Sequence, residues 1–518
     1  MGILDKKPNA DATRAAQEEA PEFEHVDWKR DPGLRKLAFY AFILCIASAT
    51  TGYDGMFFNS VQNFDSWQSY FGYPKGSDLG LLGALYQIGS LASIPIVPIM
   101  ADNLGRKIPI AVGCVIMIIG AAIQAASQNY GAFCGGRVML GFGNSLAQIC
   151  SPMLLTEIAH PQHRARLTTV YNCLWNVGAL IVAWVAFGTN FLYNEWSWRI
   201  PALLQGVPSV IQLAGIFWVP ESPRYHMAKD KHDLALKTLA KYHANGDINN
   251  ATVQFEFREI KETIRLEMEA GKSSYLDFFR TKGNRYRFAV LVSLGLFSQW
   301  SGNAIISNYS NTLYITAGVA DSTARLGLSA GQTGMSLIIS LTMASLVDKI
   351  GRRPMFLAAT GGMFGTFIFW TLTSGLYEEQ GASGAGNAMI FFIWLFQVFY
   401  SLAWSGLLVG YSIEILPYKL RAKGLMVMNL TVQCALTLNT YANPLAFEHF
   451  KGHAWKLYLI YTCWIFLELC FVYFMYIETK GPTLEELAKV IDGDEAAVAH
   501  IDIRQVEKET HINEEKVA

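Results

Sequence analysis

The chain has 518 residues, of which 52% are hydrophobic and only 16% are charged. Soluble domains carry about 25% charged residues, so this deficit indicates that much of the chain lies in lipid. The formal net charge of −1 excludes a nucleic-acid binder, which would need a basic face. The eight cysteines lie in apolar runs without a CxxC pair or a cysteine–histidine cluster, so we expect neither a disulfide nor a metal site.

The N-terminal segment is polar and precedes a long series of apolar runs. It lacks the apolar core of a secretory signal peptide, which predicts an uncleaved tail over residues 1–36. Each apolar run is close to the length of about 20 residues with which a helix spans a bilayer. The runs lie at 37–57, 79–100, 108–126, 131–156, 167–191, 200–219, 287–318, 327–347, 355–376, 388–413, 424–446 and 456–476. We therefore predict an all-α membrane protein with twelve transmembrane helices.

Basic residues gather in the loops on one side of these runs. They are Arg106, Lys107, Arg164, Arg166, Lys349, Arg352, Arg353, Lys419, Arg421 and Lys423. Because basic loops stay in the cytosol, both termini and the central segment 220–286 should be cytosolic. The central segment is polar with helical periodicity, which predicts short amphipathic helices at the inner face of the membrane. We expect a multi-pass protein of the plasma membrane.

The second half of the chain repeats the charge pattern of the first. Asp102 and Arg106 recur as Asp348 and Arg352, Glu157 and Arg164 recur as Glu414 and Arg421, and Glu221 recurs as Glu478. The interval between the copies is 246 residues for Asp102 and 257 residues for Glu157 and Glu221, and this difference of 11 residues predicts an enlarged outer loop over residues 377–386. A duplicated unit is a transporter architecture, because two lobes can rock about a site between them. We predict two pseudo-symmetric six-helix halves, 37–219 and 287–478, and a cytosolic C-terminal tail, 479–518.

Several motifs occur in a fixed order over residues 35–490. They are ADNLGRK (Ala101 to Lys107), Arg137 ahead of Gly141 and Gly143, PESPR (Pro220 to Arg224), DKIGRR (Asp348 to Arg353) and ETKG (Glu478 to Gly481). With this ordered set the chain resembles the sugar porter family of the major facilitator superfamily. The segments SQWSGNA (Ser298 to Ala304) and GYDG (Gly52 to Gly55) are similar to the fungal lactose and cellodextrin permease branch. Val409 stands where many hexose carriers of the family have a tryptophan.

The resemblance implies the major facilitator fold and transport of a sugar by alternating access. Our leading hypothesis is proton-coupled symport of a disaccharide such as lactose or cellobiose by a monomer in the bilayer. The alternatives are a hexose or pentose transporter, a facilitator without proton coupling, a sugar-sensing receptor and an exporter of another hydroxylated metabolite. We expect neither a cofactor nor an enzyme, because the sequence has no nucleophile–base set, metal cluster or phosphate loop.

Two ionisable residues in the first six runs are candidates for proton coupling. Charge inside a membrane is expensive, so Asp54 and Arg137 are functional candidates by position. Proton-coupled sugar porters have an aspartate and an arginine at these places, and the alternative is a structural ion pair. Glu468 matches no family position, and we interpret it as a buried acid hydrogen-bonded to a neighbouring helix.

A sugar site needs hydrogen-bonding groups for hydroxyls and an aromatic face for the ring. Gln299 and Asn303 are four residues apart and share a face of one predicted helix, as do Asn172 and Asn176 of another. Asn172 stands where the family has a sugar-binding glutamine. Further candidates are Gln87, Asn308, Trp404 and Gln433. The alternative for each of them is a packing hydrogen bond between helices.

The repeated charges predict a gate at the cytosolic ends of the helices. We expect salt bridges that close the inner gate of the outward-facing state, or else static anchors of the topology. The candidate gate residues are Asp102, Arg106, Glu157, Arg164, Glu221, Arg224, Asp348, Arg352, Glu414 and Arg421.

Overall fold

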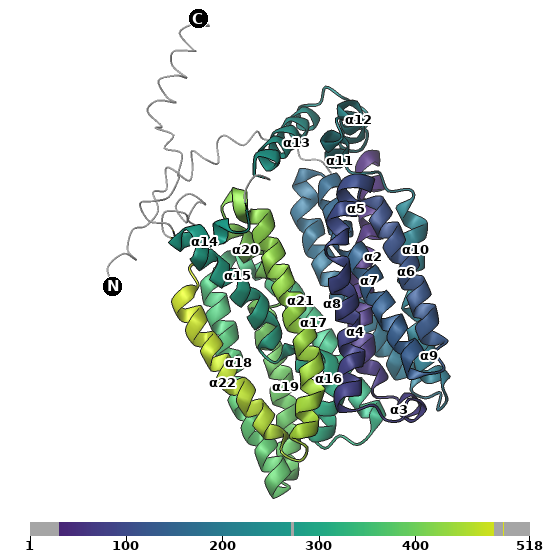
Figure 1. Cartoon of the computed structure of the whole chain (residues 1–518), viewed down its shortest axis with the longest axis vertical. Helices are drawn as coiled ribbons and strands as arrows, with labels where there is room; N and C mark the ends of the chain where they lie inside the picture. Colours follow the sequence, from purple (N-terminus) through teal and green to yellow (C-terminus); the bar gives the residue numbers. More distant parts are fainter. Residues whose placement is uncertain (1–30, 271–273, 481–490, 492–518) are drawn as a thin grey trace, which may run out of the picture.

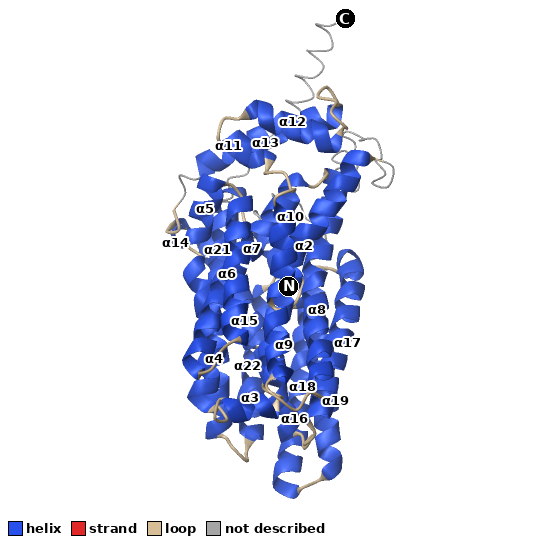
Figure 2. Ribbon diagram, turned by 90° about the vertical axis from the view of Figure 1, so that its right-hand side faces the viewer, coloured by secondary structure: helices blue, strands red, loops and turns tan. Residues whose placement is uncertain are grey.

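The computed structural model describes residues 31–270, 274–480 and 491, apart from some side chains inside helices. Within that part of the chain the regular structure is helical throughout and no strand occurs. The predicted tails, 1–36 and 479–518, lie almost wholly outside the described residues. Figure 2 shows the long helices running side by side along the molecule.

The first half contains six helical units that run between the two ends of the molecule. They are α2 (Pro32–Val61), α4 (Gly76–Ser93) with α5 (Ile96–Leu104), α6 (Lys107–Ala125), α7 (Tyr130–Ile158), α8 (Pro161–Thr189), and α9 (Trp196–Leu204) with α10 (Gly206–Ile216). Asp31 begins α2 as an N-cap, because its carboxylate accepts hydrogen bonds from the amides of Gly33 (2.7 Å) and Leu34 (3.1 Å). The axes of α4 and α5 differ by 43° across a break that contains Pro95.

The second half repeats this arrangement in the same order. Its units are α15 (Lys282–Trp300) with α16 (Asn303–Thr316), α17 (Ser322–Ile350), α18 (Arg352–Gln380), α19 (Ser383–Ala403) with α20 (Leu408–Ile415), α21 (Tyr418–His449) and α22 (Ala454–Met475). Among the described residues, eight helices are long and apolar enough to cross a membrane, or nine if the bent pair α4 and α5 counts as one span. The predicted all-α fold of twelve helices in two halves is confirmed.

The prediction of an enlarged outer loop at 377–386 is wrong in one respect, because most of these residues are helical. Helix α18 continues to Gln380, and α19 begins at Ser383. Gly381 ends α18 in the left-handed conformation that glycine adopts most readily (φ 67°). The acids near the end of α18 also have a partner on another helix, since the indole N–H of Trp455 donates to Glu379 (3.0 Å).

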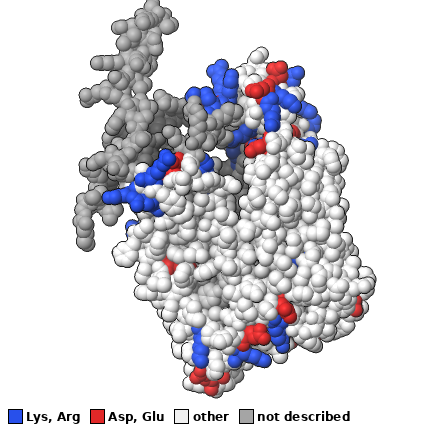
Figure 3. All heavy atoms as spheres, in the orientation of Figure 1, with Lys and Arg blue, Asp and Glu red and all other residues white. Residues whose placement is uncertain are grey.

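Short helices mark one end of the molecule, which we call the linker face; the other end is the opposite face. These helices are α11 (Pro223–Ala228), α12 (His232–His243), α13 (Ala251–Ala270) and α14 (Asp277–Arg280). Figure 1 shows α12 and α13 lying across this end above the first half, and the short α3 (Asp65–Tyr70) at the opposite face. In Figure 3 charged side chains gather at the two ends, and the surface between them is almost white. That uncharged middle band is the surface expected to meet lipid.

Glycines allow the helices of one half to approach closely. A Cβ atom on Gly52 of α2 would lie 1.8 Å from the carbonyl oxygen of Trp175, and one on Gly178 of α8 would lie 1.8 Å from that of Ala49. Any larger side chain would push α2 and α8 apart. Such small-residue contacts are typical of helix packing in membranes, where van der Waals packing replaces the hydrophobic effect.

Candidate transport site

Hydrogen bonds between buried polar groups join the two halves near the opposite face. The side chain of Asn59 at the end of α2 donates to the Ser310 hydroxyl (2.7 Å) and accepts from the Ser310 amide (3.1 Å). Gln62 donates to the carbonyl of Asn308 (2.8 Å), and Asn311 donates to the carbonyl of Gln62 (2.9 Å). We call these contacts between α2 and α16 the seal.

Other contacts extend this closure around the opposite face. The guanidinium of Arg325, near the start of α17, donates to the side-chain oxygen of Asn63 (3.2 Å). Asn190, just after α8, donates to Thr323 (3.1 Å). A Cβ on Gly80 of α4 would lie 2.7 Å from the carbonyl oxygen of a residue in α21, so these two helices touch backbone to backbone. The halves therefore close on each other at the opposite face.

The candidate proton-coupling residues are both buried inside the first half. Asp54 is 1% exposed, and one carboxylate oxygen accepts from the amide of Gln205 (3.0 Å). Arg137 is 3% exposed; its Nε donates to a backbone carbonyl of α4 (3.2 Å) and its guanidinium lies over the rings of Phe58 (4.7 Å) and Tyr86 (5.1 Å). No ion pair joins Asp54 to Arg137 in the described part of the chain. Each of the two has a buried polar atom without a hydrogen-bond partner, Oδ2 of Asp54 and one terminal nitrogen of Arg137.

The break between α15 and α16 carries two of the candidate sugar ligands. The predicted shared face of Gln299 and Asn303 is wrong, because α15 ends at Trp300 and α16 begins at Asn303. Gly302 makes the break in the left-handed conformation (φ 100°), and a Cβ there would lie 2.5 Å from the ring of Phe367. Only glycine fits this position without displacing an aromatic side chain.

The polar groups at this break are held from behind by α21 and α22. The backbone carbonyl of Gln299 accepts a hydrogen bond from Asn439 (2.7 Å), whose side-chain oxygen accepts from the hydroxyl of Tyr461 (2.9 Å). The side-chain amide of Gln299 donates to Ser298 (3.2 Å) and remains half-exposed. Asn303 has the same intermediate burial as Gln299, so neither side chain is fully enclosed by protein.

The remaining sugar candidates occupy different environments. Asn172 is exposed on α8, and Asn176, Gln87 and Gln433 are half-buried. Trp404 is fully buried, and its indole N–H donates to the hydroxyl of Thr360 (3.1 Å). Asn308 is half-buried and contributes its backbone carbonyl to the seal.

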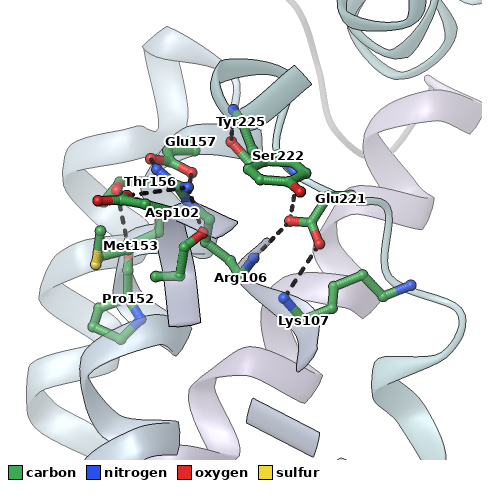
Figure 4. A network of polar contacts seen from close by, with 11 residues as sticks. Asp102, Arg106, Lys107, Pro152, Met153, Thr156, Glu157, Glu221, Ser222 and Tyr225 are labelled. Carbon is green, nitrogen blue, oxygen red and sulfur yellow. Dashed lines mark hydrogen bonds and ion pairs between the residues drawn. The ribbon is translucent and has the colours of Figure 1, made fainter. Parts of the chain in front are cut away.

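Charged clusters lie at the linker face, and the one in the first half is drawn in Figure 4. Arg106 donates to both carboxylate oxygens of Glu157 (3.1 and 3.3 Å) and lies 3.9 Å from Asp102. The carboxylate of Glu221 accepts from the backbone amides of Arg106 (3.0 Å) and Lys107 (3.3 Å). Such charge-assisted bonds fix the turn between α5 and α6 against the ends of α7 and α10.

The second half repeats this cluster residue by residue. Arg352 binds Glu414 (3.1 Å), and Glu478 accepts from the backbone amides of Arg352 (3.0 Å) and Arg353 (3.1 Å). In this state each cluster joins helices of its own half. Arg164 and Arg421 lie half-buried at equivalent places in the first turns of α8 and α21, and Arg224 lies half-buried in α11. The side chain of Asp348 lies outside the described residues.

The sequence did not indicate the residues that the end of α2 contributes to the seal, nor Gln205. Asn59, Gln62 and Asn63 stand three and four residues apart at the end of α2, a polar stripe at helical spacing in an otherwise apolar run. That stripe was the available signal for the seal. Gln205 lies 151 residues from Asp54 in the sequence, and nothing local marks it as a partner.

Comparison with known proteins identifies relatives along almost the whole chain. The model of the family described as "Sugar (and other) transporter" matches residues 40–491. A high-affinity glucose transporter of Kluyveromyces lactis is 28% identical over 90% of this chain and 87% of its own length. A quinate permease of Neurospora terricola is 27% identical over 87% of this chain and 88% of its own, and the high glucose sensor RGT2 of Saccharomyces cerevisiae is 30% identical over 84% and 58%.

Solved structures agree on the fold. The partially occluded inward-open xylose transporter XylE from E. coli superimposes with a TM-score of 0.72 at 20% identity, covering 87% of this chain and all of that one. An inward-open form of the same transporter superimposes with a TM-score of 0.71. The chain belongs to the sugar (and other) transporter family, and it is a membrane transporter with the major facilitator fold rather than an enzyme.

Proposed function

We propose that this protein is a proton-coupled symporter that carries a sugar across the plasma membrane by alternating access, as a monomer with both termini in the cytosol. The observation that carries the proposal is the closed opposite face together with a carboxylate and a guanidinium buried in the first half. A closed face on one side is what alternating access requires of one of its two states.

The charge distribution supports the proposed orientation. The basic loops predicted to be cytosolic contain Arg106 and Arg352, and both residues lie in the clusters of the linker face. In this orientation the seal closes the extracellular side and the state is inward-facing. The similarity to inward-open structures of a xylose transporter supports the same assignment.

Asp54 and Arg137 are the proposed coupling pair. An unpaired charge in a membrane protein is expensive, so an aspartate that binds a proton in one state and pairs with arginine in the other can switch between them. In the inward-facing state Asp54 hydrogen-bonds to Gln205 and makes no ion pair with Arg137. We infer that the two pair directly when Asp54 releases its proton. Arg137 would then keep the empty carrier's charge compensated.

The driving force is sufficient for concentrative uptake. One pH unit supplies ~1.4 kcal/mol per proton, and ~100 mV adds ~2.3 kcal/mol per charge. Two pH units with that potential give ~5 kcal/mol, which supports a sugar gradient of a few thousand-fold, at tenfold for each 1.4 kcal/mol. A facilitator without coupling would reach only equal concentrations.

For the cargo we propose a β-linked disaccharide such as lactose or cellobiose. The segment from Gln299 to Asn303 lies at the break of α15 and α16, with both amides half-exposed. Val409, where many hexose carriers have a tryptophan, is 51% exposed at the start of α20. A small side chain there leaves room for a second ring. Ala304 is 1% exposed and creates no such room, so this part of the argument rests on Val409.

A hexose or pentose is the second candidate cargo. It is favoured by relatives named as glucose transporters and by the xylose transporter among the structural neighbours. Uptake of labelled cellobiose, lactose, glucose and xylose, each competed by the other sugars, separates the two candidates. Strong glucose uptake that neither disaccharide competes would overturn the disaccharide proposal.

The same assay tests coupling and the remaining alternatives. A protonophore should abolish accumulation of the sugar and leave equilibration. Accumulation that survives the protonophore would contradict proton symport. Sugar binding without any flux would favour a sensor, for which the similarity to a glucose sensor is the supporting observation. Flux of quinate without flux of any sugar would favour the carrier of another hydroxylated metabolite.

A further inference from the structure

A buried histidine and a buried glutamate join the linker helices to the first half. His243 ends α12 and Glu256 lies on α13, and both side chains are 3% exposed. Nδ1 of His243 lies 2.6 Å from a carboxylate oxygen of Glu256, and Nε2 lies 3.1 Å from the backbone carbonyl oxygen of Ile158 at the end of α7. One imidazole ring thus connects three helices.

The geometry determines how many protons this contact holds. A backbone carbonyl only accepts, so Nε2 of His243 must carry a hydrogen. Nδ1 and the carboxylate oxygen of Glu256 cannot face each other with lone pairs at 2.6 Å, so a second hydrogen lies between them. Whether this proton sits on the ring or on the acid, the pair holds one proton more than a neutral imidazole beside a carboxylate.

The neighbouring titratable groups do not take over this proton. The ring of His160 lies 5.2 Å from that of His243, and burial, followed by the charge of His243, lowers the pKa of His160 to about 4. His160 is therefore neutral near pH 7, and its two ring nitrogens have no hydrogen-bond partner. His163 lies 6.0 Å beyond His160, and Asp31 acts on His160 from the start of α2.

Two further titratable groups, on the neighbouring helices α11 and α12, interact with other partners. On α11, burial lowers the pKa of His226, and the charges that act on it are Glu221 and Lys231. Lys241 of α12 lies over the ring of Tyr242 (5.2 Å), on the side of α2.

We propose that His243 and Glu256 form a proton-binding site that docks α12 and α13 onto the corner between α7 and α8, so that docking takes up one proton. When the contact opens, a solvated histidine titrates at about pH 6.5 and a glutamate at about pH 4.3. Above about pH 6.5 the open pair therefore holds one proton fewer than the docked pair. Docking is favoured by low pH and weakens by up to about tenfold per pH unit as the pH rises.

Docking at this site constrains more than the linker. Asn245, two residues after His243, donates to Asp31 (2.9 Å) and accepts from the amide of Gly33 (3.1 Å), so the same segment holds the start of α2. Helix α13 also contacts α21 of the second half. A linker released at high pH would therefore loosen a connection between the halves at the linker face. This inference is independent of the cargo and of proton coupling through Asp54.

Hydrogen–deuterium exchange of the purified full chain in lipid nanodiscs tests the proposal. Protection of residues 232–262 is measured from about pH 6 to about pH 8 and corrected for the intrinsic pH dependence of amide exchange. We expect protection to be constant below about pH 6.5 and to fall by up to tenfold per unit above it. Protection that is independent of pH over this range would overturn the proposal.

Glu256→Gln separates a proton-binding site from a merely structural contact. The glutamine amide can donate to Nδ1 of a neutral His243 while Nε2 still donates to Ile158, so docking persists without the extra proton. We expect protection that is preserved at high pH and no longer falls as the pH rises above about pH 6.5. Near pH 6 protection should instead decrease slightly, because the open histidine takes up a proton that the docked, neutral one lacks. A wild-type slope in this variant would contradict the proposal. The wild-type pH series remains decisive even if the variant fails to fold.

His232→Gln is the matched control. His232 begins α12 and lies 3.9 Å from Asp230, but both side chains are well exposed. This second histidine–acid pair of the linker should contribute nothing to docking, so the control should keep the wild-type slope. If the pH dependence of protection disappears in His232→Gln and persists in Glu256→Gln, the proton belongs to the pair of His232 and Asp230, and the proposal is refuted.

Discussion

The two halves of the molecule have equivalent charged clusters at the linker face but different residues in their interiors. At the linker face, Arg106 with Glu157 and Arg352 with Glu414 form equivalent clusters. Inside, the first half buries Asp54 and Arg137 and its first helix, α2, is continuous, whereas the equivalent unit of the second half is broken at Gly302. The duplicated unit has kept the contacts that fix its turns. Its interior has diverged, which under our proposal separates proton binding in one half from sugar binding in the other.

The largest expected effect comes from the acids inside the two halves. Asp54→Asn should abolish uphill accumulation, a loss of up to a few thousand-fold in the attainable gradient, because the amide cannot release a proton. Glu468→Gln is the matched variant in the second half, since Glu468 is fully buried and both its carboxylate oxygens lack a hydrogen-bond partner among the described residues. We expect this variant to accumulate sugar. The steady-state ratio of internal to external sugar measures both.

The opposite result would exchange the roles that we propose for the two halves. If Glu468→Gln stops accumulation and Asp54→Asn does not, proton binding belongs to the second half. Surface abundance of each variant is measured in parallel, so that poor folding is not read as lost coupling.

The equivalent clusters should differ in their contribution to stability. The side chains of Arg106 and Glu157 are 9% and 11% exposed, against 18% and 27% for Arg352 and Glu414. Removing one partner of a nearly buried pair costs about 3 kcal/mol, and a more solvated pair contributes about 1 kcal/mol. Arg106→Ala should therefore lower the melting temperature of the purified protein more than Arg352→Ala. Equal or reversed shifts would show that burial does not determine the difference.

The broken helix of the second half should dominate sugar affinity. Gln299→Ala removes a half-exposed amide at the break and should raise the half-saturation concentration by about tenfold, the equivalent of about 1.4 kcal/mol. Asn172→Ala tests the candidate sugar ligand on α8 of the first half, and a smaller change is expected because its exposed side chain is already solvated. Initial rates of sugar uptake over a concentration series measure both. A larger effect at Asn172 would move the main sugar contacts to the first half.

The smallest effect concerns the seal between the halves. Asn59→Ala removes neutral buried hydrogen bonds to the hydroxyl and the amide of Ser310. Each is worth about 1 kcal/mol, so the ratio of the two states should change at least about fivefold toward the outward-facing one. Spin-label distances across the opposite face in nanodiscs report the populations. Ser69→Ala is the control, because the hydroxyl of Ser69 donates to the carbonyl of Ser66 inside α3 (3.2 Å), outside the seal. A shift in the control that equals the shift in Asn59→Ala would rule out a specific role for the seal.

The fold was predictable because long apolar runs predict membrane helices and repeated charges predict two equivalent halves. Neither inference requires knowledge of tertiary contacts. Gly302 and neighbouring polar residues interrupt the run 287–318 in the sequence itself, but the left-handed conformation of the break depends on packing against Phe367, which the sequence does not show. The helical extension to Gln380 was also missed, because polar, glycine-rich sequence resembles a loop whether or not its acids find partners.

The candidate site was predictable only in part. Asp54 and Arg137 stand out because charge is rare inside apolar runs, but their partners are set by the conformational state and by residues distant in sequence, such as Gln205. Trp404 shows the opposite case, in which the sequence suggested a sugar contact and the structure buries the side chain. An aromatic residue in a pathway helix suits a sugar ring, yet its indole donates to Thr360 inside the second half.

Sugar-induced proton uptake is the decisive measurement of whether Asp54 carries the coupled proton. Adding the transported sugar to weakly buffered cells that express the wild-type protein should make the medium more alkaline, because each sugar enters with a proton. Asp54→Asn should still bind and exchange sugar but produce no alkalinisation. If Asp54→Asn takes up sugar and still draws protons in with it, Asp54 is not the coupling acid and its burial near Arg137 is structural.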